Sequence, residues 1–230
     1  MLFEGKNVKT NLDGLKLIIG DKMIDQVGTD CKEKYFKFVG HVLDDNLTWA
    51  GHIEHICKKL ASANFAINST KNFLPTNIRK MLYYSLFDSH LNFGNLLWGC
   101  ADQKLLGKVE KLQKKCVRNV ALAKYMAHTE PIFKEHQILK LPEKLSFCRS
   151  TFMHQYRHKK LPVSFSNIFE DINCSDELQT RHNDYNYINR PAVKKYLENF
   201  PYKKMITNWN SLNIDLKSTS EYDEFYQLSK

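Results

Sequence analysis

Two adjacent carboxylates raise the possibility of metal-dependent chemistry. Asp44 and Asp45 follow an apolar run in "FVGHVLDDNLTW", residues 38–49. Polymerase-type chemistry holds two divalent ions about 4 Å apart between carboxylates that come from separate strands. The upstream aspartates are Asp13, Asp21, Asp25 and Asp30, and none is a convincing partner. Short polar side chains in this context serve turns and helix starts, so the pattern favours a turn over a metal site.

Two further sets of side chains contain metal-ligand types. One is His52, His55 and Cys57 in "HIEHIC", and the other is Cys148 with His154 and His158. Neither set has the spacing of a known closed metal site. The chain also lacks a nucleophile elbow, a Cys-His signature and a glycine-rich phosphate loop. We therefore expect no catalytic residue, metal site or cofactor, and no self-contained enzyme.

A basic segment provides a stronger signal. In "DQKLLGKVEKLQKKCVRNVALAK", basic residues recur at helical three- and four-residue spacing and one more lies beside them. The set is Lys104, Lys108, Lys111, Lys114, Lys115 and Arg118. This pattern predicts a cationic helix face that follows a phosphate backbone. A solvated lysine face has the same pattern, and charge alone does not separate the two interpretations.

Composition limits the possible partners and location. The 230 residues include 34 Lys and Arg against 25 Asp and Glu, a net charge of +9, which favours a polyanion as partner. No run approaches the roughly 18 to 20 apolar residues of a membrane helix, and no signal-peptide pattern opens the chain. We therefore expect an intracellular protein, cytoplasmic or nuclear, with no membrane association.

Hydrophobic periodicity defines the elements that position these residues. Gly20-Asp21 predicts a hairpin turn, and residues 35–43 predict a third strand of a small antiparallel sheet over residues 14–43. Helices are predicted over about 49–70, with Thr48 as the cap, after Pro75, and over about 104–124. Pro131 and Pro142 begin two shorter helices. The predicted fold is mainly α, with a small N-terminal sheet, a helical bundle and a loosely packed C-terminal extension.

The same periodicity predicts which side chains are buried. The helix after Pro75 should place Ile78, Met81, Leu82 and Leu86 on one side. The helix over 104–124 should bury Leu105, Val109, Leu112, Cys116 and Val120.

Several blocks together resemble a known family. They are "KFVGHVLDDNLTWAGHIEHICKKL", "LYYSLFDSHLNFGNLLWG", "VEKLQKKCVRNV", "HTEPIFKEHQILKL" and "LPVSFSNIFE". Their order and spacing resemble the region that follows the polymerase core in reverse transcriptases of non-LTR (LINE-type) retrotransposons, such as the jockey elements. The resemblance extends over nearly the whole chain.

The resemblance implies a domain plan and a set of site residues. Residues 1–45 would be the end of a palm, residues 46–160 a helical thumb-like domain, and residues 161–230 a C-terminal extension. The "LG-V-x-L-D" strand of the family resembles a primer grip; here Val39 replaces the usual Leu. The positions that match are Phe38, Val39, Gly40, Val42, Leu43, Asp44, Leu47 and Trp49.

The resemblance also implies a function. The family's catalytic aspartates precede this region, so Asp44 and Asp45 would not be their equivalents. The chain would be a C-terminal fragment of an RNA-directed DNA polymerase that binds an RNA–DNA hybrid or other nucleic acid together with the palm and fingers region of a parent protein. A helical protein-interaction module and a non-functional remnant of a transposable element remain alternatives. A metal-dependent nuclease built on Asp44 and Asp45 is disfavoured.

Overall fold

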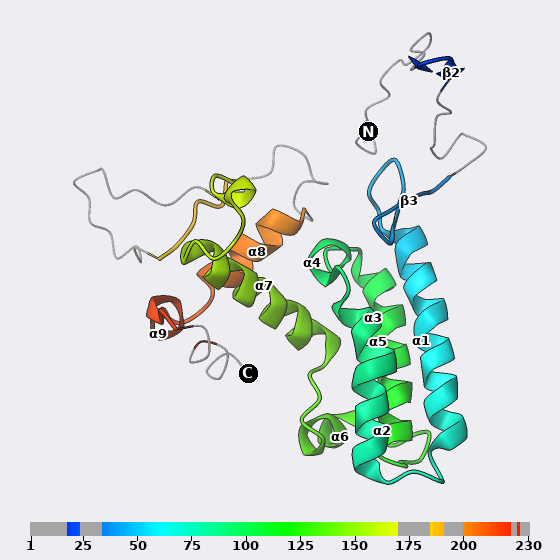
Figure 1. Ribbon diagram of the computed structural model, residues 1–230. Coiled ribbons are helices and arrows are strands. Elements are labelled where there is room, and N and C mark those ends of the chain that lie inside the picture. Colours follow the sequence, from blue (N-terminus) through cyan, green and yellow to red (C-terminus); the bar gives the residue numbers. More distant parts are fainter. Residues whose placement is uncertain (1–17, 24–33, 170–184, 191–199, 222–224, 226–230) are drawn as a thin grey trace. The chain divides into compact units, whose positions relative to one another are not determined.

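The computed structural model describes residues 18–23, 34–169, 185–190, 200–221 and 225. The chain forms two compact units, which are described separately (Figure 1). The first unit contains Met1–Gly94 and Ala101–Ile138, and the second contains Asn95–Cys100 and Leu139–Lys230. The expected mainly helical fold with antiparallel strands near the N-terminus is confirmed. No helix in the described ranges is both long and apolar enough to cross a membrane.

The strands form two short hairpins where one sheet over residues 14–43 was expected. Strand β1 (Ile18–Ile19) pairs with β2 (Lys22–Met23), and β3 (Phe36–Phe38) pairs with β4 (His41–Leu43). The prediction of one strand over residues 35–43 is wrong, because the chain reverses at Val39-Gly40. Both turn residues have positive φ, 44° and 80°, as a tight hairpin turn requires. Residues 14–17 and 24–33 lie outside the described residues.

The helices of the first unit follow the β3–β4 hairpin in the sequence. They are α1 (Ala50–Thr70), α2 (Thr76–Leu82), the π-helical segment η1 (Tyr83–Asp88), α3 (Ser89–Asn92), α5 (Gln103–Val120) and α6 (Thr129–Glu135). Helices α1 and α5 pack side by side along their lengths, as Figure 1 shows. The apolar face of α1 contributes Ile53, Ile56, Leu60, Ala63 and Ile67 to the core. The expected helix over 49–70 is thus confirmed to within one residue.

Contacts along the two helices show that α1 and α5 run parallel. Burial raises the pKa of Cys57 on α1, and the charge of Lys108 near the start of α5 opposes that rise. Towards the other end, the Asn119 amide donates to Asn64 Oδ1 at 2.9 Å, and Lys71 Nζ donates to Asn119 Oδ1 at 3.1 Å. Both helices therefore have their C-terminal ends, where the helix dipole is negative, at the same end of the unit.

The buried faces differ in part from the predicted ones. Val109, Cys116 and Val120 of α5 are buried as expected, but Leu106, Gln113 and Val117 are buried as well, and Leu105 and Leu112 are only half-buried. On the preceding helices the core side chains are Tyr83, Phe87 and Leu91, whereas Met81 and Leu86 are exposed. The π-helical turn over Tyr83–Asp88 accounts for the exposure of Leu86, because its wider turn rotates the residues within and after it relative to a regular α-helix; Met81 lies before this turn.

A buried arginine connects the ends of three helices. The Arg79 side chain on α2 is buried, and its Nε donates to the carbonyl of Val120, the last residue of α5, at 2.7 Å. Its Nη1 donates to the carbonyls of Lys71, directly after α1, at 3.1 Å and of Leu74. Its Nη2 donates to Thr76 Oγ1 at 2.9 Å. One cation thus satisfies carbonyls at the C-terminal ends of both parallel helices.

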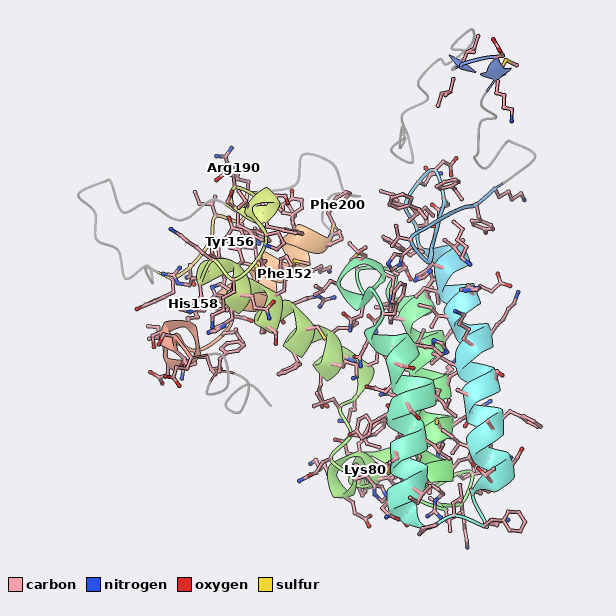
Figure 2. All side chains as sticks on the ribbon, viewed as in Figure 1. Lys80, Phe152, Tyr156, His158, Arg190 and Phe200 are labelled. Atoms are coloured by element: carbon pink, nitrogen blue, oxygen red, sulfur yellow. The ribbon has the colours of Figure 1, made fainter. Side chains whose placement is uncertain are left out.

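The second unit has its own apolar core. It contains α4 (Asn95–Trp98), α7 (Leu141–Arg157), the 3-10 helix η2 (Val163–Phe165), α8 (Pro201–Asn210) and α9 (Ile214–Ser218). Its buried cluster is Met153, Phe169, Tyr187, Met205, Ile206, Trp209 and Phe225. Phe152 and Tyr156, labelled on α7 in Figure 2, pack against this cluster. The described part of the expected loose extension is therefore packed with α7 around fully buried aromatic rings.

Polar side chains hold the C-terminal segments of this unit in register. The Asn210 side chain bonds both backbone groups of Tyr187, at 3.1 Å to the N–H and 2.9 Å to the carbonyl. Trp209 Nε1 donates to the carbonyl of Tyr185 at 2.7 Å. Asn208 donates to Ser150 Oγ at 2.7 Å, which links α8 to α7.

Replacement of Arg79 by methionine tests its role as the connection between helix ends. Arg79→Met keeps much of the side-chain volume but leaves buried carbonyls without a donor, so we expect the free energy of unfolding to fall by about 3 kcal/mol. Lys80→Met is the matched control, since Lys80 is the next residue on α2 and is only half-buried (Figure 2). Urea denaturation measures both. Equal losses in the two variants would contradict the role assigned to Arg79.

Candidate nucleic-acid interface

The predicted basic residues lie on one side of α5. The helix begins at Gln103 because Asp102 Oδ1 accepts the backbone N–H of Lys104 at 2.7 Å. Lys104, Lys108, Lys111 and Lys115 are exposed and fall within about 60° around the helix axis. Lys114 is exposed on the flank of this row. The five lysines form what we call the lysine row, and the opposite side of α5 is buried against the core.

Arg118, the sixth predicted residue, has a different environment. Its side chain is half-buried, and Nε donates to the carbonyl of Ala127 at 2.9 Å. It therefore holds the segment that follows α5, in addition to placing a positive charge at the end of the lysine row. Charge reversal at Arg118 would disturb that segment, so the five lysines provide the cleaner test of the surface.

The charge of the lysine row is not neutralised by the described part of the protein. The ion pairs that join Lys58 to Glu54 and Lys140 to Glu143 both lie outside α5. Glu110 lies on the flank of α5, where Gln103 Nε2 approaches its carboxylate at 3.5 Å. Like charges three and four residues apart destabilise a helix. A polyanion that binds along the row would relieve this repulsion.

The row has dimensions that suit a phosphate backbone. From Lys104 to Lys115 the helix rises by about 17 Å, and Arg118 extends the positively charged side to about 21 Å. Several phosphates of one strand fit within this length. Exposed ammonium groups on long flexible stems can adjust to them individually, which suits recognition of shape and charge without base readout.

The residues expected to resemble a primer grip lie on the β3–β4 hairpin and at the start of α1. Phe38 and Val39 are exposed at the tip, Val42 is half-buried on β4, and Trp49 is buried. Gly40 is required at its position, since its φ is 80° and an added Cβ would lie 3.0 Å from Phe93 Cζ. Val39 with φ of 44° is a strained conformation for a β-branched residue. The surrounding contacts must therefore fix this turn.

Two histidines anchor the hairpin to the helices. The Val42 N–H donates to His52 Nδ1 at 3.3 Å, and His52 Nε2 lies 3.3 Å from His41 Nδ1. His41 also stacks on Phe93 with ring centroids 4.9 Å apart. This close approach requires Gly94, because an added Cβ would overlap the His41 ring. The network assigns the Nε2–H tautomer to neutral His52, with Nδ1 as the acceptor.

Asp44 organises the turn between β4 and α1. Its Oδ1 accepts the backbone N–H groups of Asn46 at 3.1 Å and Thr48 at 2.8 Å, and its Oδ2 accepts the Thr48 hydroxyl at 2.8 Å. Asp45 Oδ1 accepts the Asn46 amide at 2.9 Å. The interpretation of this pair as turn residues agrees with these bonds. Thr48 is not the helix cap as predicted: Trp49, with φ of 63°, occupies that position, and the Thr48 hydroxyl accepts the Ala50 N–H at 3.3 Å.

Two of the side chains considered as metal ligands, Cys148 and His154, have other hydrogen-bond partners. Cys148 Sγ accepts the Asn95 amide at 3.2 Å, and His154 Nε2 lies 2.8 Å from the carbonyl of Thr219. His154 is fully buried. No group of three His, Cys, Asp or Glu side chains in the described ranges is arranged to hold a metal ion.

Sequence reasoning missed the histidine anchor and the hairpin turn. A glycine next to a bulky residue inside a strand pattern is the available signal for the turn, and Gly40 provides it. No sequence signal marks the His41–His52 contact, because it depends on how the hairpin lies against α1.

The histidine anchor makes stability depend on pH. Burial, with smaller effects from His41, His55 and Lys59, lowers the pKa of His52 from 6.5 to about 4. Neutral His52 therefore stabilises the fold fully above pH 6.5, and this contribution is lost as the pH falls towards 4. Protonated Nδ1 cannot accept the Val42 N–H. We expect the free energy of unfolding to fall on the order of 2 kcal/mol over this window, less than the full shift implies, because solvent partly screens the site.

Denaturation at pH 7 and pH 4.5 measures this effect. His52→Asn keeps an acceptor near Val42 but does not titrate, so the pH dependence should flatten. The control, His128→Asn, replaces an exposed histidine and should leave the pH dependence as in the parent chain. An unchanged pH profile in His52→Asn would contradict the assignment.

Comparison with known proteins supports the resemblance drawn from the sequence. No family model and no solved structure matches the chain. The chain is 27% identical over 124 residues to the RNA-directed DNA polymerase from mobile element jockey of Drosophila melanogaster. The matched part is 52% of this chain and 13% of that protein. The chain is related to the reverse transcriptases of non-LTR retrotransposons.

Proposed function

We propose that this chain binds and positions a template–primer duplex for a retrotransposon reverse transcriptase, without supplying the catalytic aspartates. The lysine row of α5 is the observation that carries the proposal. Five exposed ammonium groups lie along one side of a rigid helix and have no carboxylate partner among the described residues. An RNA–DNA hybrid is the preferred ligand, and its A-like shape is recognised through the backbone, with little sequence preference.

The similarity to the RNA-directed DNA polymerase from mobile element jockey supports this proposal. We assign residues 1–45 to the end of a palm, 46–160 to a thumb-like domain and 161–230 to an extension. In this plan Phe38, Val39, Gly40, Val42 and Trp49 act in a primer grip. The strained turn at Val39-Gly40 and its histidine anchor support the assignment, because such strain is kept where position matters.

The hairpin also has an apolar surface that suits a protein partner. Tyr35, Phe36, Phe38 and Val39 are exposed, and Phe36 and Phe38 stack with centroids 6.5 Å apart. We propose that the palm and fingers region of the parent protein covers these side chains, while the backbone of the turn contacts the primer. Exposed aromatic groups gathered on a short hairpin are typical of an interface. The alternative, a helical module that binds an acidic protein through the lysine row, predicts no affinity for nucleic acid.

Binding of the purified chain to an RNA–DNA hybrid over a salt series tests the proposal. The logarithm of the association constant should fall with that of salt concentration with a slope of about −4, as for five phosphate contacts. Charge reversal of Lys108, Lys111 and Lys115 to glutamate should weaken binding by about 100-fold and reduce the slope by about 2 to 3. The intact fold is checked by circular dichroism.

The control reverses three exposed lysines that lie off the row, Lys22, Lys134 and Lys160. It changes the net charge by the same amount, so it separates a local surface from a general effect of charge. Equal loss in both triple variants, or no binding by the folded parent chain at low salt, would refute the proposal. Binding of an acidic polypeptide in place of the hybrid would support the alternative.

A further inference from the structure

A turn that follows α5 places two apolar side chains in solvent. Tyr125 is 71% exposed and Met126 is 85% exposed. Single exposed apolar side chains are common on protein surfaces and need no explanation. These two are adjacent, and they lie at the tip of one turn close to the end of the lysine row.

The turn is held by hydrogen bonds at both ends. The Ala127 N–H donates to the carbonyl of Lys124 at 2.9 Å and closes the turn, and the Ala123 N–H donates to the carbonyl of Arg118 at 2.9 Å. Arg118 Nε donates to the carbonyl of Ala127 at 2.9 Å. The backbone on either side of Tyr125 and Met126 is therefore fixed to the last turn of α5, and the two side chains project from a supported tip.

Positively charged side chains precede this tip along α5 and begin the turn. Lys114 and Lys115 precede Arg118 by four and three residues, so they lie one helical turn away from the guanidinium that holds the turn. Lys124, the first residue of the turn, is also exposed. The nearest acidic residue along the chain is Glu130, beyond the turn on α6. The lysine row is thus followed by an apolar tip at its C-terminal end.

We propose that Tyr125 and Met126 stack against a base of the nucleic acid whose phosphates lie on the lysine row, at the end of the duplex or in its adjoining single strand. This inference rests on the proposed function. A tyrosine ring offers a flat face to any base, and the flexible methionine thioether fills the gap beside it. The cations lie in a row about 21 Å long. This linear arrangement favours a nucleic-acid strand over a lipid surface.

An RNA–DNA hybrid with a four-nucleotide overhang that contains 2-aminopurine tests the inference on the whole chain. Stacking on Tyr125 should change the fluorescence of the base on binding. Tyr125→Ala should weaken binding of this hybrid by about tenfold and abolish the fluorescence change, with the salt slope unchanged, because no phosphate contact is lost. Tyr125→Phe should bind as the parent chain does.

Phe65→Ala is the matched control, since Phe65 is 72% exposed on α1 and lies away from the buried face of that helix. It should leave binding unchanged. If Tyr125→Ala and Met126→Ala bind like the parent chain while the lysine reversals abolish binding, the inference is overturned and the proposed function stands. If the folded parent chain does not bind the hybrid at low salt, both fail. If Tyr125→Ala loses binding only to vesicles of anionic phospholipid, the tip is a lipid contact and the inference is overturned.

Discussion

The arrangement of the first unit depends on the Arg79 guanidinium. Helices α1 and α5 run parallel, which brings two negative helix ends and their unpaired carbonyls together. A planar cation with five donors can serve carbonyls that point from different directions, and a lysine in its place has no such fork. Since Val120 and Lys71 both accept from this group, the helix that carries the lysine row is fixed to the helix that carries the hairpin.

The exposed, charged side of α5 is unfavourable for the stability of that helix. Lysines at three- and four-residue spacing repel one another and lower the intrinsic stability of α5. The helix persists because its other side is packed, with Val109, Cys116 and Val120 fully buried. Tertiary packing therefore stabilises a helix whose exposed lysines would destabilise it in isolation. This pattern is expected where the residues of a surface favour binding at some cost in stability.

Features of the fold that depend on interactions between residues close in the sequence could be predicted, and features that depend on distant contacts could not. The bounds of α1 and the exposure of the five lysines depend on periodicity within one helix, and both were predicted. The turn at Val39-Gly40 was missed because valine rarely adopts positive φ. The face of the helix that includes Tyr83 was misplaced because a π-turn leaves no periodic signal. Arg79 pairs with a residue 41 positions away, and such contacts follow only from the assembled fold.

The parallel helices also place the β3–β4 hairpin and the turn with Tyr125 at opposite ends of one helix pair. The hairpin is anchored near the start of α1 through His52, and the turn with Tyr125 is anchored at the end of α5 through Arg118. Each end carries exposed aromatic side chains, and the lysine row runs from the start of α5 to its last turns. In the proposed function, the nucleic acid follows the lysine row along the helix axis to the turn with Tyr125, while the palm and fingers region covers the exposed aromatic side chains of the hairpin. The same arrangement explains why a loss of the histidine anchor at acidic pH would release one end of the surface and leave the lysine row in place.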